Sequence, residues 1–150
     1  MVTQDDIEIF FGFMQNKEQL WQAAFTNEDP SDYQAHLLHW QKILANPEII
    51  NRTVVVDGVA VGNVGSWPLD GVRQLTYWVG IEHRGKSYAS QAVAEFLKLD
   101  LTRPMEGRCA FDNLASAKVL TKNGFEQSGT DRYYANARGE EITEFIFQLL

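Results

Sequence analysis

A basic turn between two regular patterns in the sequence could bind an anion. Residues 81–90 read IEHRGKSYAS, and they follow an aromatic, β-branched run at 74–80 that predicts a strand. Arg84 and Lys86 supply two positive charges, and Gly85 supplies a flexible backbone position. If a helix begins here, the free backbone N–H groups of its first turn suit a phosphate or pyrophosphate. A solvated basic turn that only begins a helix is the alternative, and the spacing leaves both open.

The same turn lacks the signatures of two common nucleotide-binding loops. It contains neither the G-x-x-x-x-G-K-[ST] pattern of P-loop enzymes nor the G-x-G-x-x-G pattern of dinucleotide-binding domains. Neither nucleoside triphosphate hydrolysis nor Rossmann-type dinucleotide binding is therefore indicated.

A second group of polar residues stands at the start of a later predicted helix. Residues 112–125 read DNLASAKVLTKNGF, in which Asn113 is a candidate N-cap and Gly124 marks the C-terminal turn. Ser116 follows Asn113 by three residues, so both side chains can face the same side of the helix. A capping asparagine and a small packing serine are the purely structural alternatives.

Together these two segments resemble the acetyl-CoA-binding region of GNAT-superfamily N-acetyltransferases. The first family pattern is Arg or Gln, two residues, Gly, one residue, then Gly or Ala. Its three key positions are held by Arg84, Ser87 and Ala89, so Ser87 departs from the usual glycine. The second pattern, N-x-x-S-x-x-x-L-x-x-x-G-F, is matched by Asn113, Ser116, Leu120, Gly124 and Phe125. The YW pair before the loop and the second segment are most similar to the RimJ/RimL-like branch, and the resemblance is clearest over residues 53–129.

The resemblance implies a GNAT-like fold and an acyltransferase. We expect a single domain over residues 1–150 of mixed α/β class, an α+β mixed sheet. The central sheet should be mostly antiparallel with a splayed parallel pair, and helices should cover both faces. The implied reaction uses acetyl-CoA as cosubstrate and moves the acetyl group directly to a primary amine, on a protein N-terminus or a small molecule. The alternative is a non-catalytic, CoA-binding regulatory domain.

The resemblance also implies which residues hold the cofactor. The strand that ends at Gly80 is expected to part from the strand at 108–111 and to offer backbone groups to the pantetheine arm. Gly80 itself is consistent with a β-bulge. Backbone N–H groups from Arg84 through Ser90 would then hold the pyrophosphate. The expected cofactor-binding residues are Val79, Ile81, Arg84, Gly85, Lys86, Ser87, Tyr88, Ala89, Ser90, Asn113 and Ser116.

The candidate catalytic residues are Ser116, Tyr77 and Glu82. The Ser116 hydroxyl would stabilise the departing CoA thiolate, and the backbone N–H of Val79 would stabilise the oxyanion. Tyr77 shares a strand face with Val79 and would act as an acid, as an orienting group or simply as core. The general base is left open between Glu82 and Asp112, which stand at strand ends. A third alternative is that no strong base is needed, because an α-amine ordinarily has a pKa of about 8.

The elements that must position these residues follow from periodicity and turn signals. Helical periodicity predicts helices over 5–25, 30–47, 86–101 and 113–125, the second with a capping box at Ser31 and Gln34. Strands are predicted as a hairpin over 52–67 that turns at Asp57-Gly58, a strand at 73–81, a short strand at 107–112 and a closing hairpin over 126–150. The predicted order is α, α, β, β, β, α, β, α, β, β.

Composition narrows the range of partners. The 150 residues carry a formal net charge of −7, which disfavours nonspecific nucleic-acid binding and favours a cationic or amine-bearing partner. No apolar run is long enough to span a membrane, and acidic residues near the N-terminus favour a cytoplasmic protein. His36 and His39 have no visible third ligand, so no metal site is expected.

Two further expectations concern the single cysteine and the end of the chain. Cys109 has no partner for an intramolecular disulfide, and its place in a short strand predicts a buried thiol rather than a nucleophile. An exposed sheet edge near the C-terminal hairpin could pair between subunits and so form a homodimer.

Overall fold

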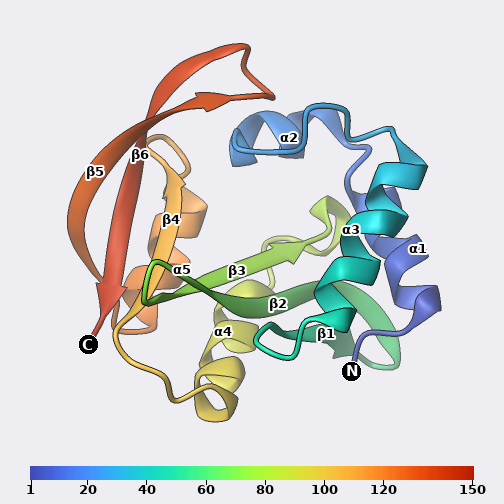
Figure 1. The fold of residues 1–150 in the computed structure, drawn as a ribbon, viewed down its shortest axis with the longest axis horizontal. Helices are drawn as coiled ribbons and strands as arrows, with labels where there is room; N and C mark the ends of the chain where they lie inside the picture. The colour runs from blue at the N-terminus through green and yellow to red at the C-terminus, as the bar shows by residue number, and fades with distance from the viewer.

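The centre of the protein is a mixed sheet of six strands. The computed structural model describes all 150 residues, and the strand order is β1-β2-β3-β4-β6-β5 (Figure 1). The strands are β1 (Ile50–Val56), β2 (Val59–Leu69), β3 (Val72–Val79), β4 (Met105–Ala110), β5 (Glu126–Ala135) and β6 (Glu140–Leu149). Neighbouring strands are antiparallel except for β3 and β4, which are parallel. The expected sheet is therefore confirmed.

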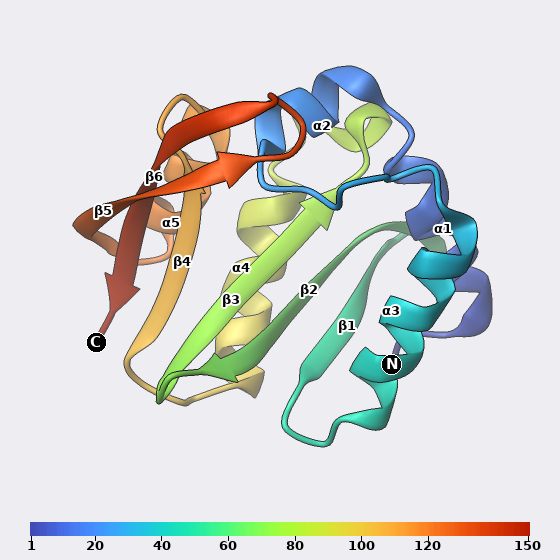
Figure 2. The same ribbon diagram turned by 45° about the horizontal axis from the view of Figure 1, so that its top comes forward.

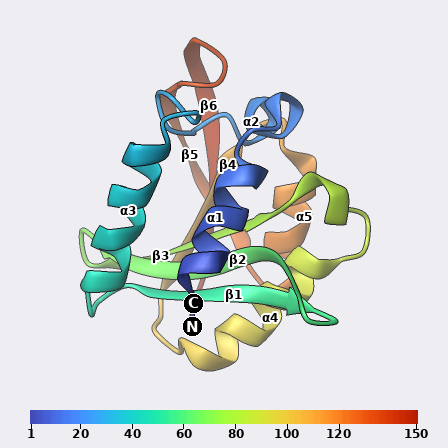
Figure 3. The same cartoon turned by 90° about the vertical axis from the view of Figure 1, so that its right-hand side faces the viewer.

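Helices cover both faces of this sheet. They are α1 (Gln4–Phe13), α2 (Lys17–Ala23), α3 (Tyr33–Ala45), α4 (Tyr88–Leu99) and α5 (Leu114–Lys122), with a short 3₁₀ helix, η1 (Ile81–His83). Figure 3 shows α1 and α3 on one side of β1–β3 and α4 on the other. The two faces have separate cores: Phe10 and Trp40 pack with Trp78, whereas Phe96 and Leu120 pack with Leu75. None of the helices has the length and apolar character needed to cross a bilayer.

The predicted first helix over 5–25 is wrong in extent, because it is two helices. The first begins at a capping box between Thr3 and Asp6 and ends at Met14. Asn16 then adopts an extended backbone, and its side chain accepts a hydrogen bond from the N–H of Gln19 at 2.9 Å. Because asparagine competes with helical hydrogen bonding in this way, Asn16 starts a second helix instead of continuing the first.

The predicted capping box at Ser31 and Gln34 is also wrong. Asp32 caps α3, and its carboxylate accepts from the N–H of Ala35 at 3.0 Å. Ser31 instead donates its hydroxyl to the carboxylate of Asp29. The helix thus begins one residue later, because Asp32 rather than Ser31 accepts a free N–H group of its first turn.

Two tight hairpins join the first three strands. The predicted turn at Asp57-Gly58 is confirmed, with φ of 50° and 79°. A second turn at Asp70-Gly71, which the sequence analysis did not single out, has φ of 51° and 80°. Positive φ at both central positions matches the right-handed twist of the flanking strands and explains the glycines. The closing hairpin of β5 and β6 is confirmed as well.

The parallel pair separates partway along its length. Only Arg73, Gln74 and Leu75 of β3 pair with β4, opposite Met105, Glu106 and Gly107. Beyond these residues the two strands diverge, as the V between them in Figure 2 shows. The predicted parting of these strands is confirmed, and its open end faces α2.

Candidate active site

The open end of the β3–β4 pair exposes backbone hydrogen-bonding groups. The N–H of Gly80 donates to the carbonyl of Val61 on β2, at 2.9 Å. Because neighbouring residues of an antiparallel strand alternate in direction, the backbone groups of Tyr77 and Val79 face the other way, toward the gap. The recorded β4 pairing ends at Leu75, so no β4 group takes the N–H of either residue.

One of these exposed groups already has a side-chain partner. Gln19, a buried residue of α2, donates its amide to the carbonyl of Val79, while its own Oε1 has no partner. Ile81, expected to act with Val79, lies in η1, and its carbonyl accepts from the N–H of Arg84 at 3.3 Å. The N–H of Val79 therefore has no β4 partner, whereas the carbonyl of Ile81 is occupied.

Gly80 does not mark a β-bulge, contrary to the sequence expectation. The register of β2 and β3 is continuous up to the pairing of Gly62 with Val79. The reason for glycine is instead the close approach of Phe13, since a Cβ at Gly80 would lie 2.6 Å from two of its ring atoms. A side chain at this position would push α1 away from the end of β3.

The basic turn presents a run of free backbone N–H groups. No hydrogen bond is recorded from the N–H of any residue from Gly85 to Ser90, where α4 begins at Tyr88. The N–H of Arg84 is excluded from this run because it is bonded to Ile81. Successive free N–H groups that lead into a helix N-terminus form a concave anion site. The turn thus has the geometry expected of a pyrophosphate site.

The backbone of Ser87 explains why glycine is usual at its position. Ser87 has φ of 61° and ψ of 21°, which is left-handed, and Gly85 has φ of 78°. Only glycine adopts this conformation without a steric cost. The Ser87 side chain makes no capping hydrogen bond and is exposed. With serine in place of the usual glycine, the loop therefore keeps its shape, but the backbone of Ser87 is strained.

Ser116 and Tyr77 meet at the N-terminus of α5. Asn113 caps this helix by accepting a hydrogen bond from the N–H of Ser116 at 3.2 Å. The Ser116 hydroxyl lies 2.5 Å from the hydroxyl of Tyr77, which reaches it from β3. Burial raises the pKa of Tyr77 above its ordinary value. At neutral pH this phenol keeps its proton, so it can donate a hydrogen bond but cannot act as a base.

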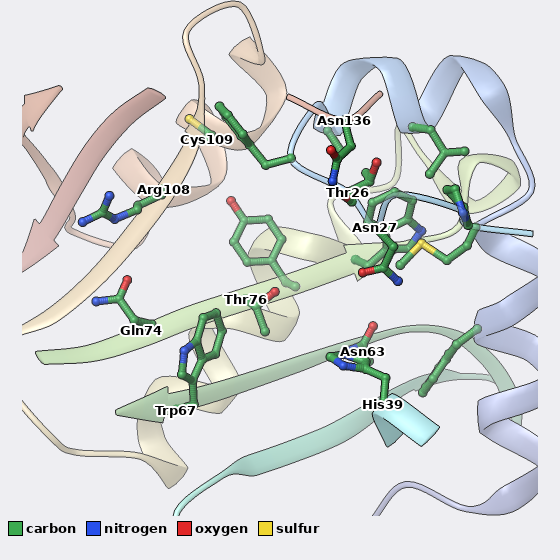
Figure 4. A pocket seen from close by; sticks show the side chains of 18 of the residues that line it. Thr26, Asn27, His39, Asn63, Trp67, Gln74, Thr76, Arg108, Cys109 and Asn136 are labelled. Atoms are coloured by element: carbon green, nitrogen blue, oxygen red, sulfur yellow. Dashed lines mark hydrogen bonds between the residues drawn. The ribbon is translucent and has the colours of Figure 1, made fainter. Parts of the chain in front are cut away.

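A cleft lies beside these hydroxyls, on the face of the sheet that carries α1 and α3. Its volume is about 770 Å³, and Cys109, Asn113 and Ser116 reach its edge. Figure 4 shows side chains from several elements that line it, namely Asn63 and Trp67 of β2, Gln74 and Thr76 of β3, Arg108 and Cys109 of β4, and Thr26, Asn27, His39 and Asn136. The cleft therefore connects the open end of the V with the helical face of the protein.

Glu144 is a carboxylate of this cleft that the sequence analysis missed. It lies on β6 opposite Ala110, is only 8% exposed, and accepts a hydrogen bond from Arg108 at 3.1 Å. Burial raises the pKa of Glu144, although the hydrogen bond from Arg108 acts in the opposite direction. Strand alternation, which places Glu144 between Ile142 and Ile146 on one face, is the only sequence signal for it.

The two carboxylates expected as bases are not brought into the cleft. Glu82 is 69% exposed in η1, and Nε2 of the His83 ring lies 3.6 Å from its carboxylate. Asp112 accepts hydrogen bonds from Nη1 and Nη2 of Arg138, at 2.7 and 2.8 Å. The hydrogen bond from Arg138 lowers the pKa of Asp112, which makes this carboxylate a weaker base.

Cys109 is buried, as predicted from its strand. It is 6% exposed, and burial raises the pKa of its thiol to about 11. The thiol is therefore almost entirely protonated at neutral pH and is a poor nucleophile.

The family follows from a comparison with known domains. A family model described as an acetyltransferase (GNAT) domain matches residues 1–126. The chain belongs to the GNAT acetyltransferase family. The family expected from the two motifs is thereby confirmed, and the match includes both of them.

One curated relative of this GNAT domain is an uncharacterized N-acetyltransferase p20 from Bacillus licheniformis. The two are 34% identical over 86 residues, which cover 54% of this chain and 48% of that protein. The match thus spans about half the length of the curated relative.

Two solved GNAT structures share the fold of the whole chain. RimL, a ribosomal L7/L12 α-N-protein acetyltransferase in complex with coenzyme A, has a TM-score of 0.78 at 16% identity, over 97% of this chain and 89% of that chain. Spermidine N-acetyltransferase from Vibrio cholerae, in complex with CoA and spermine, has a TM-score of 0.77 at 14% identity, over 98% and 92%. The expected GNAT-like fold class is confirmed.

Proposed function

We propose that this GNAT protein transfers the acetyl group of acetyl-CoA directly to a primary amine, on a protein N-terminus or a small molecule. The observation that carries the proposal is the open end of the V. Unpaired N–H groups of β3 stand there beside a loop of free N–H groups between Gly85 and Ser90. Family membership supports acetyl transfer, and the RimL and spermidine N-acetyltransferase neighbours support the two acceptor classes.

The chain's own groups fit the cosubstrate. The loop from Gly85 to Ser90 would hold the pyrophosphate, with Arg84 and Lys86 adding positive charge. The N–H of Tyr77 would pair with an amide carbonyl of the pantetheine arm as a strand partner does. The buried Oε1 of Gln19 has no partner and would accept one N–H in the same gap.

Bound acetyl-CoA would supply the acetyl thioester. Residues at the open end of the V would stabilise the charge that develops on its carbonyl oxygen and on its sulfur. The N–H of Val79 would donate to the carbonyl oxygen as negative charge develops on it. The paired hydroxyls of Ser116 and Tyr77 would donate a hydrogen bond to the departing CoA thiolate, because the raised pKa of Tyr77 keeps its phenol protonated. The protonated, buried Cys109 argues against a covalent acetyl-cysteine and supports direct transfer.

Glu144 is the carboxylate best placed to accept the proton of the amine. An ammonium has no lone pair, so the acceptor must lose a proton before or during attack. Glu144 lines the cleft, and its raised pKa makes it a better base than an exposed carboxylate. Glu82, the base expected from the sequence, lies outside the cleft.

The acceptor is proposed to be cationic before it reacts. The cleft is lined by Asp29, Asp32, Asp70 and Glu144 against one arginine, Arg108. With a net charge of −7, the protein would attract an ammonium group and repel polyanions such as nucleic acids. A homodimer through the open edge of β5 is a further proposal, and light scattering after size exclusion tests it.

The test has two measurements. Titration calorimetry with acetyl-CoA should give saturable binding, and a panel of amines followed by CoA release should identify acceptors. Absence of binding at high micromolar acetyl-CoA would reject the proposal. Binding without turnover of any amine would instead favour the non-catalytic, CoA-binding regulatory domain.

A further inference from the structure

A chain of side-chain hydrogen bonds crosses the open end of the V. Gln22 of α2 accepts from Nη1 of Arg84 through its Oε1 and donates through its Nε2 to Oδ1 of Asn113, at 3.2 Å. Arg84 caps η1 directly before the loop of free N–H groups from Gly85 to Ser90, and Asn113 caps the N-terminus of α5. Figure 2 shows α2 above the open end of the V, in position to span it. One glutamine thus links Arg84, which the proposed function assigns to the cosubstrate, to Asn113, which the sequence resemblance predicts to bind it.

The chemistry of Arg84 determines which groups donate and which accept in this series of hydrogen bonds. A guanidinium has only donors, so the group of Gln22 that faces it must be the carbonyl oxygen. The amide nitrogen of Gln22 then faces Asn113 and can only donate. The Oδ1 of Asn113 therefore takes this bond together with the N–H of Ser116, both at 3.2 Å.

This arrangement leaves the amide nitrogen of Asn113 free. No hydrogen bond is recorded from Nδ2 of Asn113, and Asn113 lines the cleft beside Ser116. Without Gln22, only the N–H of Ser116 would hold the Asn113 amide in this orientation. With Gln22 present, flipping that amide would break two hydrogen bonds instead of one.

We propose that Gln22 is a positioning residue of the acetyl-CoA site, because it fixes the Asn113 amide with its N–H groups directed at a carbonyl oxygen of the cosubstrate. The inference rests on the proposed function, and it adds to the site a residue of α2 outside both sequence motifs. Gln22 touches Arg84 and Asn113 rather than the reacting atoms, and it acts through Asn113.

The test is a double-mutant cycle read by acetyl-CoA affinity and thermal stability. Gln22→Met keeps the size of the side chain and removes both hydrogen bonds, and Gln22→Ala is a second removal variant. Asn113→Ser keeps a good N-cap and removes the amide donors. Glu18→Gln is the matched control, because Glu18 is exposed on the same helix and makes no hydrogen bond through its side chain.

The expected result is a coupling between Gln22 and Asn113. Gln22→Met should raise the Kd for acetyl-CoA about fivefold, the effect of losing one ordinary hydrogen bond, with little change in Tm. In the Asn113→Ser background the same substitution should change the Kd less than about twofold. Glu18→Gln should leave the Kd unchanged.

Two results would overturn the inference alone. An equal loss of affinity in both backgrounds would show that Gln22 does not act through Asn113, and an unchanged Kd in the Gln22 variants would show that it positions nothing. Failure of the unsubstituted protein to bind acetyl-CoA is a different result, because it rejects the proposed function and the inference together.

Discussion

At the scale of single residues, Ser87 places a side chain in the loop from Gly85 to Ser90 that is proposed to hold the pyrophosphate. Its φ of 61° is easy for glycine and costs other residues about 1 kcal/mol. Since the backbone N–H is unchanged by the substitution, Ser87→Gly should keep acetyl-CoA affinity within about tenfold of the unsubstituted protein. Calorimetry measures this directly, and a collapse of binding would identify the Ser87 hydroxyl as a principal ligand.

Ser87→Val is the contrasting variant for the same loop. A β-branched side chain is strongly disfavoured at positive φ, so the loop must either change shape or remain strained. We expect the free energy of unfolding to fall by about 1–2 kcal/mol and acetyl-CoA binding to weaken beyond the effect of Ser87→Gly. If Ser87→Gly and Ser87→Val had the same stability and the same affinity for acetyl-CoA, the loop would not need the left-handed conformation.

The proposed proton acceptor, Glu144, gives a further prediction at the residue scale. Glu144→Gln should lower kcat about 100-fold, because it removes the proposed base while keeping a group that can accept from Arg108. Burial raises the pKa of Glu144, so activity should rise with pH through that raised value, and this acid limb should disappear in the variant. Steady-state kinetics against pH measures both effects.

Two further substitutions separate Glu144 from other carboxylates. Glu141→Gln, on the exposed part of the same strand, should leave kcat and its pH profile unchanged. Glu82→Gln tests the base expected from the sequence. Loss of the acid limb in Glu82→Gln, with a normal profile in Glu144→Gln, would reverse the assignment.

At the scale of elements, the closed end of the V depends on a buried ion pair. Asp100, which follows α4, accepts from Ser66 of β2 at 2.6 Å and from Arg73 of β3 at 2.9 Å. Burial alone would raise the pKa of Asp100, but the hydrogen bonds from Ser66, Thr102 and Arg73 outweigh it and lower the pKa to about 2. The interaction ties α4 to the strands at the place where β3 and β4 still pair.

Asp100→Asn should therefore lower the free energy of unfolding by about 3 kcal/mol at pH 7, because it leaves the Arg73 charge buried without a counter-ion. The contribution of a carboxylate with a depressed pKa is complete above its unfolded pKa of about 4 and is lost as the pH falls toward 2. Urea unfolding at pH 7 and pH 3 should thus show a smaller difference between variant and parent at the lower pH.

The control for this pair is the exposed ion pair on α4. Glu95 and Lys98 lie 2.9 Å apart, and both are more than 70% exposed. Glu95→Ala should change the free energy of unfolding by less than about 1 kcal/mol, because water screens such pairs. A comparable loss in both variants would show that burial of Asp100 has no special effect.

The elements themselves were largely predictable from local patterns, and the failures have local causes. Alternation and the Asp57-Gly58 turn identify a hairpin because both signals lie within a few residues. The break at Asn16 was not predictable, because asparagine is also tolerated inside a helix and packing decides between the two. Gln22 and Asn113 are 91 residues apart, so no local pattern connects them. The motif residues could be predicted, whereas the residues that position them could not.

At the scale of the whole molecule, the sheet consists of two halves with a narrow connection. β1, β2 and β3 form one half, β4, β6 and β5 form the other, and only three residues of β3 pair across the junction. A ligand that fills the V adds backbone hydrogen bonds between the halves. Acetyl-CoA should therefore stabilise the fold as a whole while protecting a small set of amides.

Acetyl-CoA at 100 times its Kd should raise the free energy of unfolding by about 2.7 kcal/mol, which for a domain of this size raises Tm by about 5–11 °C. Amide hydrogen exchange should slow most at Tyr77, Val79 and residues 85–90, whose N–H groups have no partner in the protein. Amide exchange in the outer strands β1 and β5 should slow only by the amount that the overall stabilisation accounts for, since these strands lie at the two edges of the sheet. Stabilisation without slower exchange at these amides would place the ligand elsewhere, because a bound cosubstrate that leaves the free N–H groups unprotected cannot be paired with them.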